Sequence, residues 1–222
     1  MKKNQINYVT ISALLMIVIM INSCSEQAME SGDTQTNSVT TDESNITNDF
    51  RIANYFTKTT GAPIDREKAN QWIRNYALVN GQGFEYQVKA EALKEILSRT
   101  NCNGISFRYG LNADNQLHII PVGVDNTGTE MKSDRVTTAE GHISWELSKE
   151  YTNRYWGTVR AHYFGANTFE RLFKSNDCKI IRITLALDES NNPQLLLSDF
   201  AQADSNSLED DSIACPPVCP NN

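Results

Sequence analysis

The first folded segment of the chain shows the hydrophobic spacing of a helix. Asp65 is placed to cap it, and apolar side chains then recur at i, i+3, i+4 and i+7, namely Ala69, Trp72, Ile73 and Tyr76. A second helix is predicted over residues 86–99, where one stripe holds Leu93, Ile96 and Leu97. The segment therefore begins with two helices in succession.

The pattern then changes to the two-residue period of a strand. Large apolar residues alternate with small or polar ones at Ile105, Phe107, Tyr109 and Leu111. The polar sequence NADNQ follows as a turn, and LHIIPVGV is typical of a second strand. Residues 50–132 are thus predicted to form a helix–helix–strand–strand unit.

The same order of patterns recurs in residues 133–222. Cys102 and Cys178 each precede an alternating strand, and they lie 76 positions apart (178 minus 102). The matching apolar positions of the second copy are Phe169, Leu172 and Phe173 in a helix and Ile181, Ile183, Leu185 and Leu187 in a strand. The sequence ANQWIRNY in the first copy corresponds to SKEYTNRY in the second. TTAE at residues 137–140 has the spacing of a capping box for the helix that contains SKEYTNRY.

This recurrence predicts a duplicated α+β architecture. A two-stranded hairpin with two helices makes a thin core by itself. We therefore expect both units to form one compact body with antiparallel hairpins and approximate two-fold symmetry. The pattern leaves open whether the units join through their strands or pack helices against a sheet.

The first 23 residues have the features of a signal peptide. Lys2 and Lys3 precede a largely apolar run at residues 9–21, which is shorter than the roughly 20 residues that a membrane span needs. The sequence INSC resembles the lipobox of bacterial lipoproteins, which implies cleavage before Cys24 and attachment of lipid to its sulfur. An ordinary secretory signal cut nearby is the alternative.

Residues 24–49 are predicted to be a flexible tether. They are rich in Ser, Thr, Asp, Glu and Asn and have hardly a large apolar side chain, so they cannot bury enough surface to offset the entropy of ordering. A coil of this length would hold the folded body about 25–30 Å from the membrane.

The charge of the chain argues against some partners. The whole sequence has 20 Lys and Arg against 27 Asp and Glu, a net charge of −7. Removal of residues 1–23 takes away Lys2 and Lys3, so the mature chain would carry 18 basic and 27 acidic groups, a charge of −9. Nucleic acid and anionic lipid heads both require clustered cations, so we expect no nucleic-acid partner and membrane attachment through the lipid alone.

Several motifs together resemble one group of proteins. YFG at Tyr163 to Gly165, the later Cys178 and the tail CPPVC from Cys215 to Cys219 are similar to short, mostly uncharacterised envelope proteins of the Bacteroidota with a Cys-Pro-Pro-x-Cys tail. CNGISFRYGLNADNQLHIIPVGVD in the first unit fits the same pattern. The resemblance implies a lineage and an envelope setting, and it implies no activity.

Four cysteines remain besides Cys24, and three pairings are open to them. Cys215 and Cys219 are candidates for a small local disulfide, because two prolines stiffen the segment between them. Cys102 and Cys178 either meet across the symmetry axis or stay as separate buried thiols, and we favour the separate thiols. The tail does not have zinc-site spacing, so no metal is expected.

The sequence does not indicate catalysis or a cofactor. It has no Gly-x-Ser-x-Gly, His-Glu-x-x-His or phosphate-loop motif. Its three histidines are expected in polar or packing roles: His118 at a solvated or edge strand position, His142 on a helix and His162 before YFG. A hydrolase with an unrecognised site would need two of them to converge with a carboxylate.

The aromatic residues are predicted to lie mainly in the core. Aromatic side chains at helical spacing are more often buried than part of a carbohydrate or peptide groove. The set that would line such a groove is Trp72, Trp145, Trp156, Tyr151, Tyr155, Tyr163 and Phe164.

These features predict a lipid-anchored protein of the cell envelope, on the periplasmic or surface side of the outer membrane. Its role would be non-catalytic binding or envelope organisation, with a protein or glycan partner. One alternative is an immunity-type lipoprotein that neutralises a positively charged toxin. The other alternative is the hydrolase with an unrecognised site.

Overall fold

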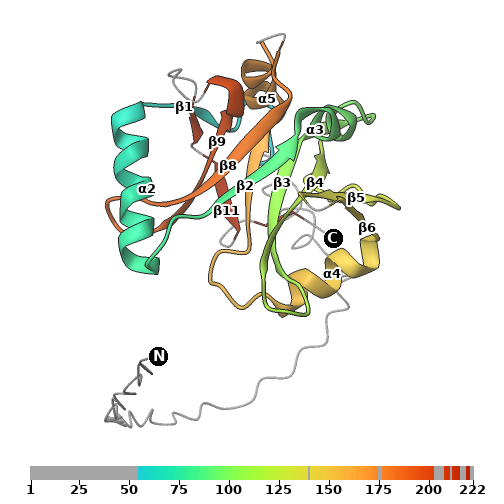
Figure 1. Cartoon of the computed structure of the whole chain (residues 1–222). Coiled ribbons are helices and arrows are strands. Elements are labelled where there is room, and N and C mark those ends of the chain that lie inside the picture. The colour runs from blue at the N-terminus through green and yellow to red at the C-terminus, as the bar shows by residue number, and fades with distance from the viewer. Residues whose placement is uncertain are drawn as a thin grey trace, which may run out of the picture. The chain divides into compact units, whose positions relative to one another are not determined.

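The computed structural model describes residues 55–139, 141–174, 177–202, 208–210, 212–215 and 219–220 (Figure 1). The predicted signal peptide, the tether and Cys24 lie outside these residues. The helices are α2 (Arg66–Asn80), α3 (Ala90–Leu97), α4 (Trp145–Arg154) and α5 (Ala166–Leu172), with a short 3₁₀ turn, η1 (Phe200–Gln202).

The strands form two larger sheets and one small hairpin. Their bounds are β1 (Ala62–Ile64), β2 (Glu85–Lys89), β3 (Cys102–Leu111), β4 (Leu117–Asp125), β5 (Val136–Thr138), β6 (Gly141–Ile143), β7 (Ala161–Gly165), β8 (Ile180–Leu187), β9 (Pro193–Asp199), β10 (Leu208–Asp210) and β11 (Ile213–Cys215). The five-stranded sheet has the order β1-β10-β9-β8-β2, the four-stranded sheet has the order β11-β7-β3-β4, and β5 pairs with β6. Neighbouring strands are antiparallel, so the body is a compact α+β structure as predicted.

The order of elements differs from the predicted helix–helix–strand–strand unit. A strand precedes the second helix in both halves, β2 before α3 and β7 before α5. In β2 the buried Tyr86 and Val88 alternate with exposed neighbours, which is a strand period. The predicted helix over residues 86–99 was therefore too long, because an apolar strand runs directly into it.

The predicted capping box was also wrong. Residues 137–139 belong to β5 and its turn rather than to a helix start. The helix α4 begins at Trp145, and the Ser144 side chain caps it by accepting a hydrogen bond from the Leu147 N–H. The Asp65 cap of α2 is as predicted, since its carboxylate accepts from the N–H groups of Glu67 and Lys68.

The two halves of the chain exchange the strand that runs into their second helix. β2 pairs with β8 of the second half, and β7 of the second half pairs with β3 of the first. The first helix of each half follows the same rule, since α2 packs against β8 and α4 packs against β3. Figure 1 shows α2 and α4 on opposite sides of the molecule, next to these strands.

The hairpins of the two halves have the same local geometry. Asn115 and Asn191 both have a positive φ, 58° and 62°, and they lie 76 positions apart (191 minus 115). Asn112 and Asp188, also 76 positions apart, each accept two backbone N–H bonds across the turn. The starts of β2 and β7, of α3 and α5, and of β4 and β9 keep this same separation.

The main hydrophobic core lies between the two larger sheets. It is built from Ile105, Phe107, Ile119 and Phe164 of the four-stranded sheet, from Ile181, Ile183, Leu195 and Leu197 of the five-stranded sheet, and from Leu93 and Phe169 of α3 and α5. Each such side chain contributes about 1.5–3 kcal/mol on burial. Smaller clusters lie under α2 and under α4.

The contact between β3 and β7 makes a testable prediction at Gly104. A Cβ added there would overlap the Phe164 carbonyl oxygen and would lie 2.8 Å from the Gly165 Cα. Gly104→Ala is therefore expected to lower the free energy of unfolding by about 1–3 kcal/mol, measured by chemical denaturation. Gly83→Ala is the matched control, because no atom lies within 4 Å of its added Cβ. Equal effects of the two substitutions would contradict the tight β3–β7 junction.

Candidate functional site

The candidate site is a groove of about 920 Å³ beside the last strand of the four-stranded sheet. Its floor is β4 at Pro121, Val122 and Gly123. One wall is α3, and the other wall is the start of α4 with the segment 131–137. A smaller hollow of about 420 Å³ continues it between α3 and the β5–β6 hairpin and shares four lining residues, Ala92, Glu95, Thr137 and His142.

The groove lies where it does because β4 is the edge strand. Within the described residues, β5 packs beside β4 without pairing with it, and the segment 129–131 forms hydrogen bonds to the far end of that edge. There the Met131 N–H donates to the Gly123 carbonyl at 2.8 Å, and the Asp125 N–H donates to the Thr129 carbonyl at 2.9 Å. The Arg99 side chain holds the same segment by donating to the carbonyls of Met131, at 3.0 Å, and Lys132.

The opposite wall is also fixed by hydrogen bonds. The tip of the β5–β6 hairpin is attached to β2, because the Ala139 N–H donates to the Tyr86 hydroxyl at 2.7 Å. Val136 and Trp145 are buried against Ile120 and Val122 on the outer face of β4. Because both walls are held to the body, the groove is already formed without a ligand.

A buried ion pair connects the elements around the groove. Arg108 of β3 donates to the Glu130 carboxylate at 3.0 Å and to the Thr152 hydroxyl of α4 at 2.7 Å. Its guanidinium also lies 5.9 Å from the ring centre of Trp145. Burial raises the pKa of Glu130, although the charges of Arg108 and Lys149 act in the opposite direction. The pair therefore joins β3, α4 and the covering segment.

The charges that line the larger groove are balanced. Its carboxylates are Glu95, Asp134 and Glu146, and its cations are Arg99, Lys132 and Arg135. Arg99 is already engaged with backbone carbonyls, whereas the exposed Glu95 has no ion-pair partner among the residues that the structure describes. Asp134 and Glu146 are exposed as well, and neither has an ion-pair partner in the described part of the chain. All three wall carboxylates are therefore open to a ligand cation, and Glu95 is the one on α3.

The structure does not bring the three histidines together. The predicted helix setting of His142 was wrong, whereas His118 lies on the edge strand β4, one of its two predicted settings. His118 is buried, not solvated, and its ring lies 5.3 Å from that of Tyr151. His142 lies on β6 rather than on a helix, is exposed, and contacts the Thr137 hydroxyl at 3.3 Å. These placements follow from the β5–β6 hairpin and from α4, which covers the outer face of β4.

His162 is the histidine with the most unusual environment. It is fully buried on β7, and its Nδ1 lies 2.8 Å from the Ser212 hydroxyl. Burial lowers the pKa of its imidazole to about 3. Its Nε2 has no hydrogen-bond partner within the described part of the chain, whereas a base that activates a serine is oriented by a third group. The described contacts of His162 and Ser212 are therefore not those of a catalytic triad.

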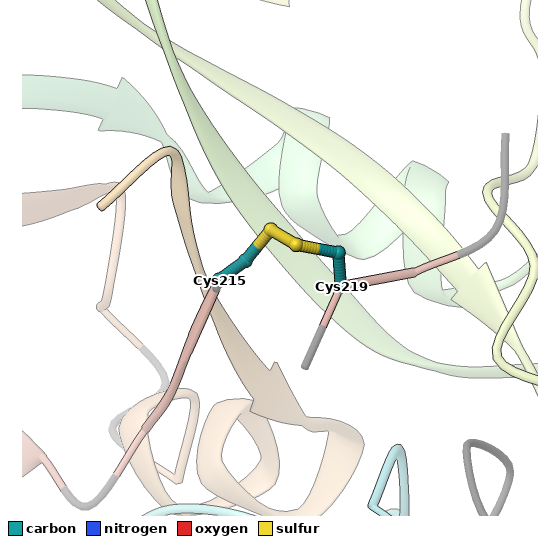
Figure 2. Close-up of a disulfide and its surroundings, with 2 residues drawn as sticks. All are labelled: Cys215 and Cys219. Carbon is teal, nitrogen blue, oxygen red and sulfur yellow. A yellow bond between two sulfur atoms is a disulfide. The ribbon is translucent and has the colours of Figure 1, made fainter. Parts of the chain in front are cut away.

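The four cysteines within the described residues occupy two kinds of environment. Cys215, the last residue of β11, and Cys219 form a disulfide with their Cα atoms 4.7 Å apart (Figure 2). Cys102 and Cys178 are separate, buried free thiols rather than a pair. Burial raises the pKa of both thiols, to about 11 for Cys178, so they stay protonated at neutral pH. Cys24 lies outside the described residues.

The aromatic residues are mostly packing residues, and they do not gather around one groove. Trp72, Trp145, Tyr163 and Phe164 are buried in different clusters. Trp156 is 86% exposed and does not line the groove. Trp145 is the one member of the predicted set that lines the groove, on the α4 wall.

Sequence reasoning did not find Glu95 or Pro121 as site residues. Pro121 offered a signal, because proline inside a strand pattern indicates an edge strand. Glu95 offered none, since a single carboxylate on a helix is ordinary on a protein surface. Among the described residues, no three His, Cys, Asp or Glu side chains gather as a metal site would require.

Comparisons with protein-family models, curated proteins and solved structures found no match to this chain. In the part of the chain that the structure describes, no helix combines the length and the apolar character needed to cross a membrane.

The burial of His162 predicts a pH dependence of stability. The unfolded chain takes up a proton on this residue near the usual pKa of 6.5, whereas the folded protein resists it down to about 3. The contribution of His162 to the free energy of unfolding is therefore fully present above about pH 6.5. It falls as the pH is lowered toward 3, by at most about 1.4 kcal/mol per pH unit. Denaturation at pH 4, 5, 6 and 7 should show a shallower slope for His162→Phe, while His142→Phe should keep the wild-type slope. Parallel curves for wild type and His162→Phe would refute the assignment.

Proposed function

We propose that this chain is a non-catalytic binding module of the cell envelope, anchored by lipid on Cys24, which receives a protein or glycan partner in the groove beside β4. The groove carries the proposal. Its volume, about 920 Å³, lies within the range of roughly 300–1,000 Å³ that ligand sites occupy. Its walls are held by the Arg99 and Ala139 hydrogen bonds, so a ligand would meet a surface that is already ordered.

The envelope setting rests on the N-terminal sequence. The signal-like residues 1–23 and the lipobox-like INSC support export and lipid attachment, and the polar residues 24–49 support a tether of about 25–30 Å. The Cys-Pro-Pro-x-Cys tail supports the same setting through its resemblance to Bacteroidota envelope proteins, and its disulfide suits an oxidising compartment. In this arrangement the lipid holds the chain, and the tether lets the groove reach partners away from the bilayer.

We also infer that the body arose by duplication of one helix–strand–helix–strand–strand unit. The support is the repeated element order, the separation of 76 positions between the starts of β2 and β7, of α3 and α5 and of β4 and β9, and the two asparagines at the same left-handed turn position. A duplicated body of this kind begins with two equivalent strand edges, β4 and β9, of which one can be closed and the other used for binding.

Blocking the groove tests the binding role. Ala92 of α3 lines both hollows, so Ala92→Trp would fill the groove with an indole. Purified mature chain would be titrated with a panel of extended octapeptides and soluble oligosaccharides, and binding followed by fluorescence polarisation. We expect wild-type binding to fall at least tenfold in Ala92→Trp, the loss of about 1.4 kcal/mol.

Ala201→Trp, at an exposed position away from the groove, is the control and should bind as wild type does. The proposal is wrong if no panel member binds the wild-type chain, or if the two tryptophan variants bind equally.

The anchor has its own test at Cys24. Cys24→Ala removes the sulfur that would carry the lipid, so the protein is expected to move from the membrane fraction to the soluble fraction and to lose labelling by radioactive palmitate. Cys102→Ala is the control, because its thiol is buried in the body and should leave both measurements unchanged. Membrane partitioning that persists in Cys24→Ala would rule out the lipid anchor.

A further inference from the structure

We propose that the groove binds an extended polypeptide as an added strand antiparallel to β4, with a lysine or arginine of the partner facing Glu95. The inference rests on the proposed binding role of the groove and names the class of its partner. It comes from the other half of the molecule, where the equivalent position is filled by the chain itself.

The filled position is the edge of β9. β9 occupies in the second half the place that β4 occupies in the first, and β10 pairs antiparallel with it, Leu208 opposite Ser198 and Glu209 opposite Leu197. The positions 76 residues before Ser198 and Leu197 are Val122 and Pro121, which form the floor of the groove. The groove is therefore the counterpart of a site that already holds an extended strand.

The helix beside each edge shows which charge that strand should carry. Arg171 of α5 binds Glu209 of β10 through Nε, at 3.0 and 3.1 Å, and through Nη2 at 2.6 Å. The residue 76 positions before Arg171 is Glu95 of α3, which lines the groove. At the filled site, the helix α5 carries the cation and the strand β10 carries the acid. At the groove, the helix α3 carries the acid. Its complement is a basic residue on the incoming strand.

The backbone of β4 is oriented to accept such a strand. At the hairpin turn, the Asn112 N–H donates to the Gln116 carbonyl. In an antiparallel pair, hydrogen-bonded and non-hydrogen-bonded residue pairs alternate along the strands. The register of β3 and β4 therefore makes the even-numbered residues of β4 bond to β3. The odd-numbered residues face away from β3, as the bond from the Met131 N–H to the Gly123 carbonyl shows. The N–H and carbonyl of Ile119 and the carbonyl of Pro121 thus lie on the edge that borders the groove.

Pro121 makes this association weaker than the internal one. Leu197 has a backbone N–H to offer to β10, whereas Pro121 has none, so an incoming strand forms one backbone bond fewer. Proline at this position also disfavours non-specific pairing of the β4 edge with strands of other proteins. A partner strand can therefore bind and leave, whereas β10 is part of the fold.

The experiment uses two acetylated octapeptides of alternating valine and threonine that differ only in one central residue, lysine or glutamate. Binding to the mature chain is measured by fluorescence polarisation. The wild-type protein should bind the lysine peptide about threefold to fivefold more tightly, which corresponds to an exposed ion pair of up to about 1 kcal/mol. Glu95→Arg should reverse this preference, and Glu170→Arg, an equal charge change on the exposed face of α5, should leave it unchanged.

Two further measurements test the strand pairing itself. Pro121→Leu supplies the missing N–H and should tighten both peptides about twofold to tenfold. A lysine peptide with N-methyl groups on alternate backbone nitrogens cannot donate to Ile119 and Pro121, so it should lose binding.

The results separate the two proposals. In the first case, Ala92→Trp abolishes binding, but neither wild type nor Glu95→Arg distinguishes the two peptides, or N-methylation has no effect on binding. The groove is then a binding site, and its assignment to an added strand is wrong. If the mature chain dimerises without peptide and Ala92→Trp prevents it, a second copy is the occupant and the assignment is again wrong. Binding that is unchanged by Ala92→Trp overturns the role of the groove as well.

Discussion

The exchange of β2 and β7 between the two halves is the constraint on which the rest of this structure depends. Neither hairpin has enough neighbours within its own half, because a two-stranded ladder is marginal in water. β2 completes the sheet of β8 and β9, and β7 completes the sheet of β3 and β4. The main core forms between these two sheets, so Phe164 of the second half packs with Phe107 of the first, their ring centres 5.9 Å apart. The halves are therefore one cooperative body.

The differences between the two halves are what give the molecule its groove. β10 and β1 extend the five-stranded sheet beyond β9, and Arg171 fixes β10 through the buried Glu209. On the four-stranded sheet the added strand, β11, lies at the opposite edge, beside β7. Beyond β4, the segment 129–131, the β5–β6 hairpin and the start of α4 surround an open space. The Arg108–Glu130 pair stabilises this arrangement only because both partners are present, since either charge alone would be buried without compensation.

How far the sequence predicts this protein depends on the length of each pattern. The helix α2 and the hairpins β3–β4 and β8–β9 were found because they span enough residues to show a period, and Asp65 marked its helix start. β2 and β7 were missed because five-residue strands run directly into helices at Ala90 and Ala166. The setting of His142 was misjudged, and the burial of His118 was not foreseen, because both depend on which elements cover β4. Glu95 and Pro121 gain meaning only if the proposed duplication makes them the counterparts of Arg171 and Leu197, 76 positions later.

The sequence by itself determined the mixed α+β composition and the recurrence at 76 positions, because local hydrophobic spacing and turn residues such as Asn115 and Asn191 act within a few positions. It also made Cys215 and Cys219 candidates for a local bridge, because the separation is short. The tertiary structure alone decided which strands pair, which sheet edge is closed by β10 and which is left as a groove. Strand pairing depends on hydrogen bonds and ion pairs between residues distant along the chain, and no local sequence pattern specifies which distant strand becomes the partner.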